Sequence, residues 1–520
     1  MIRIGTLFVL LLIAPAHAQT VAAPPGFDPH LVADVYATAL AFMAPRTLEP
    51  VPVSQLTVWG LRGLTALDSE LTAQLSDGKL RLTQRDRVIA TRPAPTEADI
   101  NGWADAAADL ALAAAGTSLP VRRGGTQAVV QNFFDELFNH LDVYSRYVPP
   151  HEAKQDRERR VGQAGTGLHL IRRGSVIVVD AAVADGPGAV AGIRPGDTIL
   201  SVDGRSARGK DATTVMSWMA GPEATSLTIA WRSHDGRAHS IGIERAIVPP
   251  ETVFVERTGD LMLIQITEFN RTTDSHLAEA IGQGIAGARP PAGIILDLRG
   301  DRGGLLRQAV SAADTLLPAG IVTMTVGRDP EATKVWRSNP GELAGDVPVV
   351  VVVDGRTASA AEILAAALAD RGRGVVIGSS TLGKGLVQTI APLPDGGELY
   401  VTWSRVLAPR GWPIQSLGLL PQVCTSLGQD ALSWQLAALA QGRQPMAKAL
   451  ETHRAARAPL QPAQILAIRN NCPAAEGRDA DIATARLLVH DPAAYAAALL
   501  PPLRSTNGQV SAVSGQAATP

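Results

Sequence analysis

One stretch, residues 347–378, reads VPVVVVVDGRTASAAEILAAALADRGRGVVIG and decides the fold. Its consecutive valines predict a buried strand, the residues DGRT predict a tight turn, and the alanine-rich run from Ala360 predicts a helix. The final GVVIG predicts a second buried strand. Continuous apolar strands that alternate with helices indicate a largely parallel sheet covered on both faces. The fold class is therefore α/β.

The same alternation extends over residues 248–424, where LMLIQI and AGIILDLRG each precede a predicted helix. The preceding segment has short strands, Asp-Gly turns and one helix at ATTVMSWMAG, which indicates a compact β-rich module. The N-terminal segment is predicted to be mainly helical, with short strands around Asp77-Gly78 and with Pro149-Pro150 ending a helical run. The predicted division is a signal peptide (1–18), a leader (19–26), a helical N-terminal domain (27–160), the β-rich module (162–247), the α/β domain (248–424), a helical C-terminal region (425–504) and a disordered tail (505–520).

Composition excludes recruitment of partners by charge alone. The formal net charge is -2, and charged residues make up 18% of the 520 residues, so no strong field attracts nucleic acid or anionic membranes. The N-terminus has an early arginine, a short apolar run and the small-residue site Ala16-His17-Ala18, which predict a secretory signal cleaved near Ala18. An uncleaved anchor is the alternative. We expect an exported protein, periplasmic or otherwise extracytoplasmic.

The two cysteines of the chain are Cys424 and Cys472. In an oxidising compartment such a pair predicts a disulfide, worth about 4 kcal/mol in the chain-entropy model for a loop of this length. Two unpaired thiols are the alternative. Two cysteines alone do not make a metal site, and we expect none.

Ser359 lies at the junction between the valine strand and the following helix. A side chain at such a junction is held at the carboxyl edge of the sheet, near free backbone N–H groups, which suits a nucleophile. The sequence Ser359-Ala360-Ala361-Glu362 also fits a capping box, in which the serine only caps the helix. Both interpretations stay open on these residues alone.

Lys384 lies between two glycines in TLGKGLVQ, on a loop that we expect to be flexible. Burial of its stem among apolar groups would favour the neutral amine, which can take a proton from a serine hydroxyl. Gln388 could orient this amine if the glycines let the chain curl. A solvated loop lysine is the alternative. The Ser-His-Asp route has little support, because no histidine lies between His276 and His453.

The segment DLRGDRGG, residues 297–304, follows another predicted strand. Glycines at this position leave N–H groups that can stabilise an oxyanion. The candidates are Gly303 or Gly304, with Ala360 as the second donor. An ordinary strand-to-helix turn is the alternative.

The motifs GIILDLRGDRGG, GRTASAAEILAAAL and TLGKGLVQT, in this order and spacing, resemble the carboxyl-terminal processing proteases, which are serine peptidases of family S41. The resemblance runs from about Leu141 to about Val423. It implies that Ser359 is the nucleophile, Lys384 the general base and Gln388 its orienting partner. One departure is that the family commonly has Asn-Pro-Gly-Gly where this chain has Asp301-Arg302-Gly303-Gly304.

The segment GTGLHL…AGIRPGDTILSVDG, within residues 165–204, resembles the PDZ domain of that family. A PDZ domain accepts a chain terminus as an added strand, so Gly165, Thr166, Gly167 and Leu168 are the predicted peptide-binding residues. The resemblance implies cleavage of proteins near their C-termini, without a cofactor or metal. It leaves homo-oligomers and an adaptor protein open as partners. The alternatives are a PDZ module that is only a spacer, a catalytically inactive PDZ scaffold, and a crotonase-like acyl-transfer enzyme.

Overall fold

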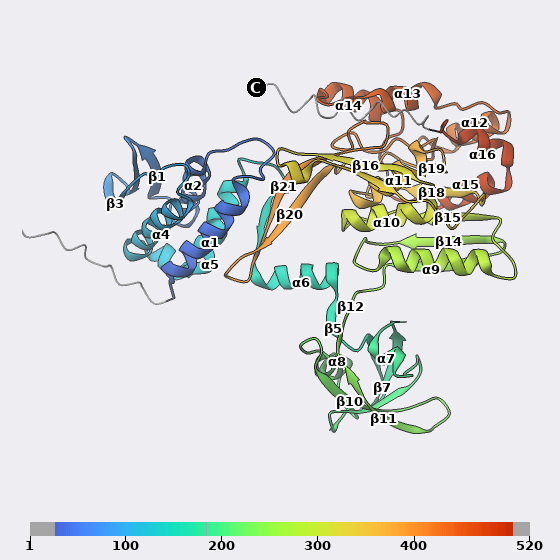
Figure 1. Ribbon diagram of the computed structural model, residues 1–520, viewed down its shortest axis with the longest axis horizontal. Coiled ribbons are helices and arrows are strands. Elements are labelled where there is room, and N and C mark those ends of the chain that lie inside the picture. The colour runs from blue at the N-terminus through green and yellow to red at the C-terminus, as the bar shows by residue number, and fades with distance from the viewer. Residues whose placement is uncertain (1–25, 184, 503–520) are drawn as a thin grey trace, which may run out of the picture. The chain divides into compact units, whose positions relative to one another are not determined.

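The computed structural model describes residues 26–183 and 185–502 and divides into two compact units, whose elements are labelled in Figure 1. The first unit comprises Pro50–Tyr147, Ala391–Leu399 and the chain up to Ala44. The second comprises Pro45–Glu49, Val148–Ile390 and the chain from Tyr400. The predicted signal peptide, nearly all of the leader and the predicted C-terminal tail lie outside the described residues.

The first unit is mainly helical, as predicted. Its helices are α1 (Pro29–Met43), α2 (Val53–Arg62), α3 (Leu64–Leu67), α4 (Ile100–Thr117) and α5 (Leu119–Phe138). A three-stranded sheet of β1 (Leu71–Ser76), β2 (Lys79–Gln84) and β3 (Arg87–Pro93) contains the predicted strands. Asp77 and Gly78 join β1 to β2 with φ of 52° and 66°, which is the conformation that an Asp-Gly hairpin turn requires.

The prediction that Pro149-Pro150 ends the second helical run is wrong. Helix α5 already ends at Phe138, and the short strand β4 (Arg146–Val148) follows. Pro150 instead begins α6 (Pro150–Val161), where proline is favoured because its missing N–H would have no partner in the first turn.

The β-rich module has one sheet in the order β11-β10-β8-β7-β6, so β6 is an edge strand. Its helix α8 (Ala212–Met219) lies where ATTVMSWMAG predicted one. A short ribbon of β5 (Gln163–Gly165) and β12 (Ala246–Val248) joins the two ends of the module. The other elements are β6 (Leu168–Arg173), β7 (Val176–Ala182), α7 (Pro187–Val190), β8 (Thr198–Val202), β9 (Arg205–Ser206), β10 (Ser226–Arg232) and β11 (Ala238–Glu244).

The α/β region is built on a six-stranded sheet in the order β13-β14-β15-β18-β19-β22. All neighbours pair in parallel except the edge strand β13, which is antiparallel to β14. The strands are β13 (Val253–Thr258), β14 (Leu261–Ile266), β15 (Gly293–Asp297), β18 (Val349–Val353), β19 (Gly374–Gly378) and β22 (Val423–Cys424). The valine strand therefore lies in the interior of the sheet, as its composition predicts.

Helices cover both faces of this sheet. Alternate residues of each strand point to opposite faces and therefore pack into two different cores. Val349, Val351 and Val353 join one core with α9 (Thr273–Ala286), α10 (Leu306–Leu316) and α11 (Ala360–Asp370). Val350 and Val352 face the other core, which is closed by C-terminal helices. The C-terminal helices are α12 (Gln429–Ala440), α13 (Ala447–Ala455), α14 (Pro462–Arg469), α15 (Asp479–His490) and α16 (Pro492–Ala498); α12, α15 and α16 supply this second core.

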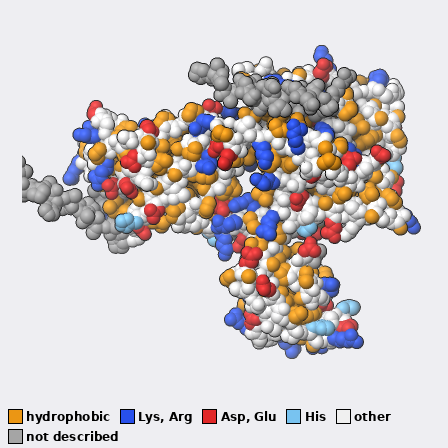
Figure 2. Space-filling model, viewed as in Figure 1, with side chains coloured by type: hydrophobic (Ala, Val, Ile, Leu, Met, Phe, Trp, Pro, Cys, Tyr) orange, Lys and Arg blue, Asp and Glu red, His pale blue; other side chains and the backbone are white. Residues whose placement is uncertain are grey.

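A second sheet in this region has the order β17-β16-β21-β20. Its strands are β16 (Gly320–Val326), β17 (Lys334–Ser338), β20 (Leu386–Pro392) and β21 (Glu398–Leu407), and a 3-10 turn, η1 (Pro330–Ala332), joins β16 to β17. On the face seen in Figure 2, acidic and basic side chains are both spread over the surface with apolar groups between them. Within the described ranges, no helix has the length and hydropathy needed to span a bilayer.

Candidate active site

Ser359 lies in a tight turn at the carboxyl end of β18. The turn is fixed by Asp354, whose Oδ1 accepts hydrogen bonds from the N–H groups of Arg356 and Thr357 at 2.9 and 3.0 Å. The Thr357 hydroxyl donates to the Leu298 carbonyl at 2.8 Å, which ties the turn to the end of β15. Ser359 itself has φ 57° and ψ -117°. Such a conformation is uncommon and costly for a residue other than glycine, and it is concentrated at functional sites.

The buried carboxylate of Glu362, in the first turn of α11, connects the serine turn to the lysine loop. Its Oε2 accepts from the backbone N–H of Ser359 at 2.8 Å and from that of Lys384 at 2.9 Å. Its Oε1 accepts from the Gly383 N–H at 2.8 Å and from the Thr381 hydroxyl at 2.5 Å. Because one oxygen bonds both Ser359 and Lys384, the two backbones are held next to each other.

Burial raises the pKa of Glu362, while its four hydrogen bonds oppose that rise. The Thr381 hydroxyl accepts from the Leu419 N–H at 2.7 Å, so its own proton points to Glu362. All four groups therefore donate to the side chain, which is the pattern of an ionised carboxylate. The motif S-x-x-E suggested a capping box, and Glu362 does receive the Ser359 N–H, but its bonds to the lysine loop were not foreseen.

The glycines on both sides of Lys384 led us to expect a flexible loop, but the loop is packed and hydrogen-bonded to residues 415–416. Gly383 and Gly385 are buried, and a Cβ on Gly385 would lie 2.1 Å from the Gln415 nitrogen. The Gly385 N–H donates to Gln415 Oε1 at 2.9 Å, and the Gly383 carbonyl accepts from the Ser416 N–H at 2.8 Å. The glycines therefore permit close backbone packing, and Lys384 is half-buried on a fixed loop.

Gln388 lies in β20, so the chain between it and Lys384 does not form a helical turn. Its Nε2 donates to the Leu386 carbonyl at 3.2 Å and to the Thr402 hydroxyl at 3.0 Å. These bonds fix the amide plane and leave Oε1 as its acceptor. Its predicted role as the partner that orients Lys384 stays a prediction.

The predicted oxyanion segment lies directly against the serine turn. A Cβ on Gly303 would lie 2.7 Å from the Ser359 Cβ and 2.8 Å from the Ala360 nitrogen. The Gly303 N–H already donates to Asp301 Oδ1 at 2.7 Å. Of the two glycines predicted as alternatives, Gly304 is therefore the better candidate donor, together with Ala360 at the first position of α11.

Asp301 is a buried carboxyl group within this segment that the sequence did not single out as functional. Its backbone carbonyl accepts from the Ala358 N–H at 2.9 Å, and its Oδ2 is buried without a hydrogen-bond partner among the described residues. Burial raises the pKa of Asp301 well above its usual value, the hydrogen bond from Gly303 opposes that rise, and the charge of Glu268 adds to it. The uncharged acid is thus favoured at this position.

The predicted peptide-binding residues form the connection from β5 to the edge strand β6. Gly165 ends β5, and Leu168 begins β6. Thr166 is buried, with its hydroxyl 3.6 Å from the Met219 sulfur of α8. Gly167 has φ 71°, a conformation that favours glycine. An edge strand beside a helix is the surface to which an extended peptide can add as another strand.

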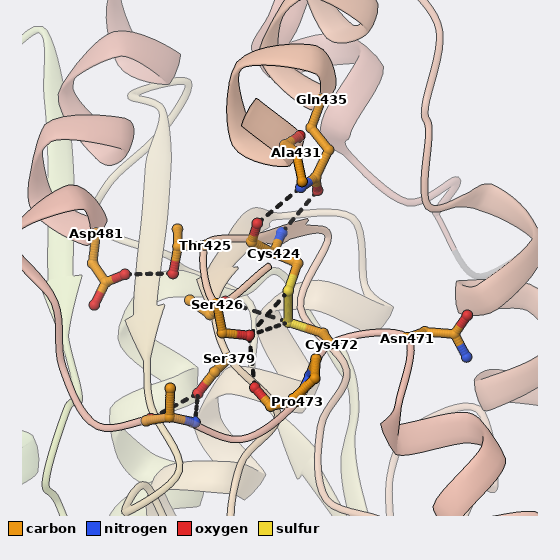
Figure 3. Close-up of a disulfide and its surroundings, with 12 residues drawn as sticks. Ser379, Cys424, Thr425, Ser426, Ala431, Gln435, Asn471, Cys472, Pro473 and Asp481 are labelled. Atoms are coloured by element: carbon orange, nitrogen blue, oxygen red, sulfur yellow. Dashed lines mark hydrogen bonds between the residues drawn. A yellow bond between two sulfur atoms is a disulfide. The ribbon is translucent and has the colours of Figure 1, made fainter. Parts of the chain in front are cut away.

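The two cysteines form a disulfide, as the compartment argument predicted. Cys424, at the end of β22, is bonded to Cys472, which follows α14. Figure 3 shows Ser426 beside the bridge, and its hydroxyl donates to the Pro473 carbonyl at 2.6 Å. The bridge therefore joins the central sheet to the C-terminal helices.

Comparisons with known proteins identify two regions of the chain. Residues 260–425 match peptidase family S41, and residues 178–233 match the PDZ domain. The chain is 33% identical over 302 residues to a carboxy-terminal-processing protease of Bartonella bacilliformis, a match that covers 57% of this chain and 69% of that protein. It is 32% identical over 288 residues to the carboxy-terminal processing protease CtpA of Bacillus subtilis, covering 55% of this chain and 61% of that protein.

Among solved structures, the photosystem II D1 C-terminal processing protease is similar, with 26% identity over 58% of this chain and 87% of that chain and a TM-score of 0.34. The chain therefore belongs to the carboxy-terminal-processing proteases of peptidase family S41, serine-type peptidases, and carries a PDZ domain.

Proposed function

We propose that this protein is an endopeptidase that cuts extracytoplasmic proteins near their C-termini, with Ser359 as nucleophile and Lys384 as general base. The observation that carries the proposal is the Glu362 carboxylate, which bonds the backbones of both residues through a single oxygen. A nucleophile and a base from separate loops need such a common support to stay within reach of each other.

In the proposed mechanism, the neutral Lys384 amine takes the proton of the Ser359 hydroxyl as its oxygen attacks the scissile carbonyl. The N–H groups of Gly304 and Ala360 stabilise the oxyanion that forms. The protonated amine then gives its proton to the leaving nitrogen as the peptide bond breaks, which leaves an acyl-enzyme. A water molecule, deprotonated by Lys384, attacks the ester carbonyl. The bond from the acyl carbon to Ser359 Oγ breaks, and the Lys384 ammonium returns its proton to Oγ as the new C-terminus leaves.

The PDZ domain would hold the substrate by its C-terminal tail, at the connection from Gly165 to Leu168. The supporting feature is the edge of β6, which pairs with no further strand of its sheet among the described residues. Main-chain bonds to this edge give affinity, and backbone N–H groups of the preceding loop can receive the terminal carboxylate. We further propose export, on the basis of residues 1–18 and the Cys424–Cys472 bridge, because disulfides persist in oxidising compartments.

The test uses a soluble polypeptide with an apolar C-terminal tail, with cleavage followed by mass spectrometry. Wild-type protein should cut it, and Ser359→Ala should bind the tail with unchanged affinity but release no product. Amidation of the terminal carboxylate should weaken binding by the wild type. Equal cleavage by wild type and Ser359→Ala would rule out this nucleophile. Tail binding without cleavage by the wild type would favour the inactive scaffold.

A further inference from the structure

The segment Cys472–Gly477, here called the strap, runs between α14 and α15 without helical or strand structure. It begins at the disulfide to Cys424, and its far end is followed by Arg478, whose N–H donates to Asp481 Oδ2 at 2.8 Å. Asp481 in turn accepts from the Thr425 hydroxyl at 2.6 Å. Both ends of the strap are therefore attached to the end of β22, as Figure 3 shows for the disulfide and for Asp481.

The middle of the strap is hydrogen-bonded to the ends of β18 and β19. The Ala475 carbonyl accepts from the Gly355 N–H at 2.7 Å and from the Ser379 hydroxyl at 2.9 Å. The Ala475 N–H donates back to the Ser379 oxygen at 3.0 Å. The Gly477 N–H donates to Asp354 Oδ2 at 3.0 Å.

These partners are the first residues of the two loops that carry the proposed dyad. Asp354 and Gly355 begin the turn that leads to Ser359, and Ser379 begins the loop that leads to Lys384. A Cβ on Gly355 would meet the Ala475 oxygen at 3.1 Å and the Ala474 Cβ at 3.3 Å, so the strap lies in direct contact with the turn. Ser379 and Asp354 are both buried, which strengthens these bonds by excluding water.

Asp354 extends the connection to the third part of the site. While Oδ2 accepts from Gly477, its Oδ1 accepts from the Gly300 N–H at 3.1 Å, in the segment that leads to Gly304. Arg299, next to Gly300, donates to the Arg478 carbonyl at 3.1 Å. The region from Cys472 to Arg478 thus contacts the oxyanion segment and the first residues of both the serine turn and the lysine loop.

We infer that the strap, through Ala475 and Gly477, positions the loops of Ser359 and Lys384 for catalysis. This role rests on the proposed function and goes beyond it, because it gives the C-terminal region a part in the active site besides covering the sheet. The strap acts through Asp354 and Ser379 and does not touch substrate. A displacement of about 1 Å between reacting groups can reduce the rate about a hundredfold. Small shifts of the first residues of the two loops would therefore lower kcat.

The test variant is Ser379→Ala, which removes both hydrogen bonds to Ala475. Its control is Ser338→Ala, since Ser338 is a buried serine of β17 whose hydroxyl lies within hydrogen-bond distance of two backbone carbonyls, those of Pro318 and Gly320, at 2.6 and 3.2 Å. The double variant Cys424→Ala, Cys472→Ala releases the start of the strap. All proteins are compared by melting temperature, by kcat and KM on the tailed polypeptide, and by hydrogen exchange.

We expect Ser379→Ala to lower kcat about tenfold or more, with KM within about twofold of the wild type and a melting temperature similar to that of Ser338→Ala. Amide exchange should rise in residues 354–359 and 379–385 of Ser379→Ala and not in Ser338→Ala. If the double cysteine variant folds, it should show the same pattern of exchange. If it does not fold, Ser379→Ala alone tests whether the strap positions the two loops.

Unchanged exchange in both loops of Ser379→Ala would overturn the positioning role, whether or not the protein is a peptidase. So would a kcat equal to that of Ser338→Ala. If the wild type cuts no tailed polypeptide while Ser379→Ala still loosens both loops, the proposed function fails and the strap remains an ordering element.

Discussion

Glu362 is the residue on which the geometry of the site depends most directly. Its two oxygens accept from four donors, which include the backbones of Ser359, Gly383 and Lys384. A glutamine offers only one acceptor oxygen in the same volume. Its amide N–H groups would face donors and leave some of them unpaired, at about 1–3 kcal/mol each.

We therefore predict that Glu362→Gln lowers kcat at least tenfold and destabilises the fold by about 1–3 kcal/mol. Urea unfolding and steady-state kinetics measure the two effects. Glu279→Gln, the same substitution at an exposed position of α9, serves as the control and should change neither. A Glu362→Gln protein with wild-type kcat would show that this carboxylate does not hold the dyad.

Asp301 gives a pH dependence whose sign follows from its burial. The pKa of this carboxyl is raised in the folded state from its usual value of 3.8, so the folded protein binds the proton more tightly than the unfolded chain. Its contribution to stability is complete below the unfolded pKa and is lost as pH rises through the folded pKa. Asp301→Asn keeps the acceptor for the Gly303 N–H and cannot ionise.

The free energy of unfolding of the wild type, minus that of Asp301→Asn, should therefore fall as pH rises above about 4, by at most about 1.4 kcal/mol per pH unit. Urea titrations of both proteins from acid to neutral pH measure this difference. A difference that is constant or increases over the range would mean that Asp301 is not held as the neutral acid.

At the scale of elements, the lysine loop is held by a segment distant in sequence. Gly385 packs against Gln415, where a Cβ would lie 2.1 Å from a backbone nitrogen. We predict that Gly385→Ala destabilises the protein by about 1–3 kcal/mol and lowers kcat, since backbone atoms cannot move aside as a side chain can.

The matched control is Gly282→Ala in α9, where an added Cβ meets nothing within 4 Å. It should be neutral or stabilise by up to about 1 kcal/mol, because alanine favours a helix more than glycine does. Thermal unfolding of both variants separates the two outcomes. Equal effects would mean that the loop adapts to the added methyl group.

The elements that the sequence predicts well are those whose pattern is local. The valine strand and GVVIG are apolar throughout because they are buried on both faces, and the Asp77-Gly78 turn is set by two residues alone. The fixed state of the lysine loop depends on residues 414–418, and local composition gives no signal for that contact. The motif S-x-x-E pointed to Glu362 as a cap, but its bonds to Gly383 and Lys384 required the tertiary structure.

Pro149-Pro150 shows how a local signal can be placed in the wrong element. Proline predicts a boundary, but it marks the start of α6 as readily as the end of a preceding helix. The burial of Asp301 is a further property that one sequence does not display. It results from the packing of the glycine segment against the serine turn.

At the scale of the whole molecule, the C-terminal helices α12, α15 and α16 cover one face of the six-stranded sheet. Leu488 of α15 is fully buried in the core that contains Val350 and Val352, whereas its neighbour Leu487 is 60% exposed. We predict that Leu488→Ala destabilises the protein by about 2–5 kcal/mol and that Leu487→Ala changes stability by less than about 0.5 kcal/mol. Urea unfolding of the two variants provides the comparison. Similar losses for both would place α15 outside the folding core.

Two parts of the second unit thus support the proposed dyad. Glu362 of α11 bonds the serine turn and the lysine loop, and the C-terminal segment around Ala475 and Gly477 bonds the first residues of both loops. The measurement that tests the proposed dyad most directly is the pH dependence of kcat/KM for wild type and Lys384→Ala on the tailed polypeptide. The wild-type rate should rise with pH as the amine loses its proton, and Lys384→Ala should lose about a hundredfold or more at every pH while unfolding at the wild-type temperature. A folded Lys384→Ala protein that cuts at the wild-type rate would contradict the account.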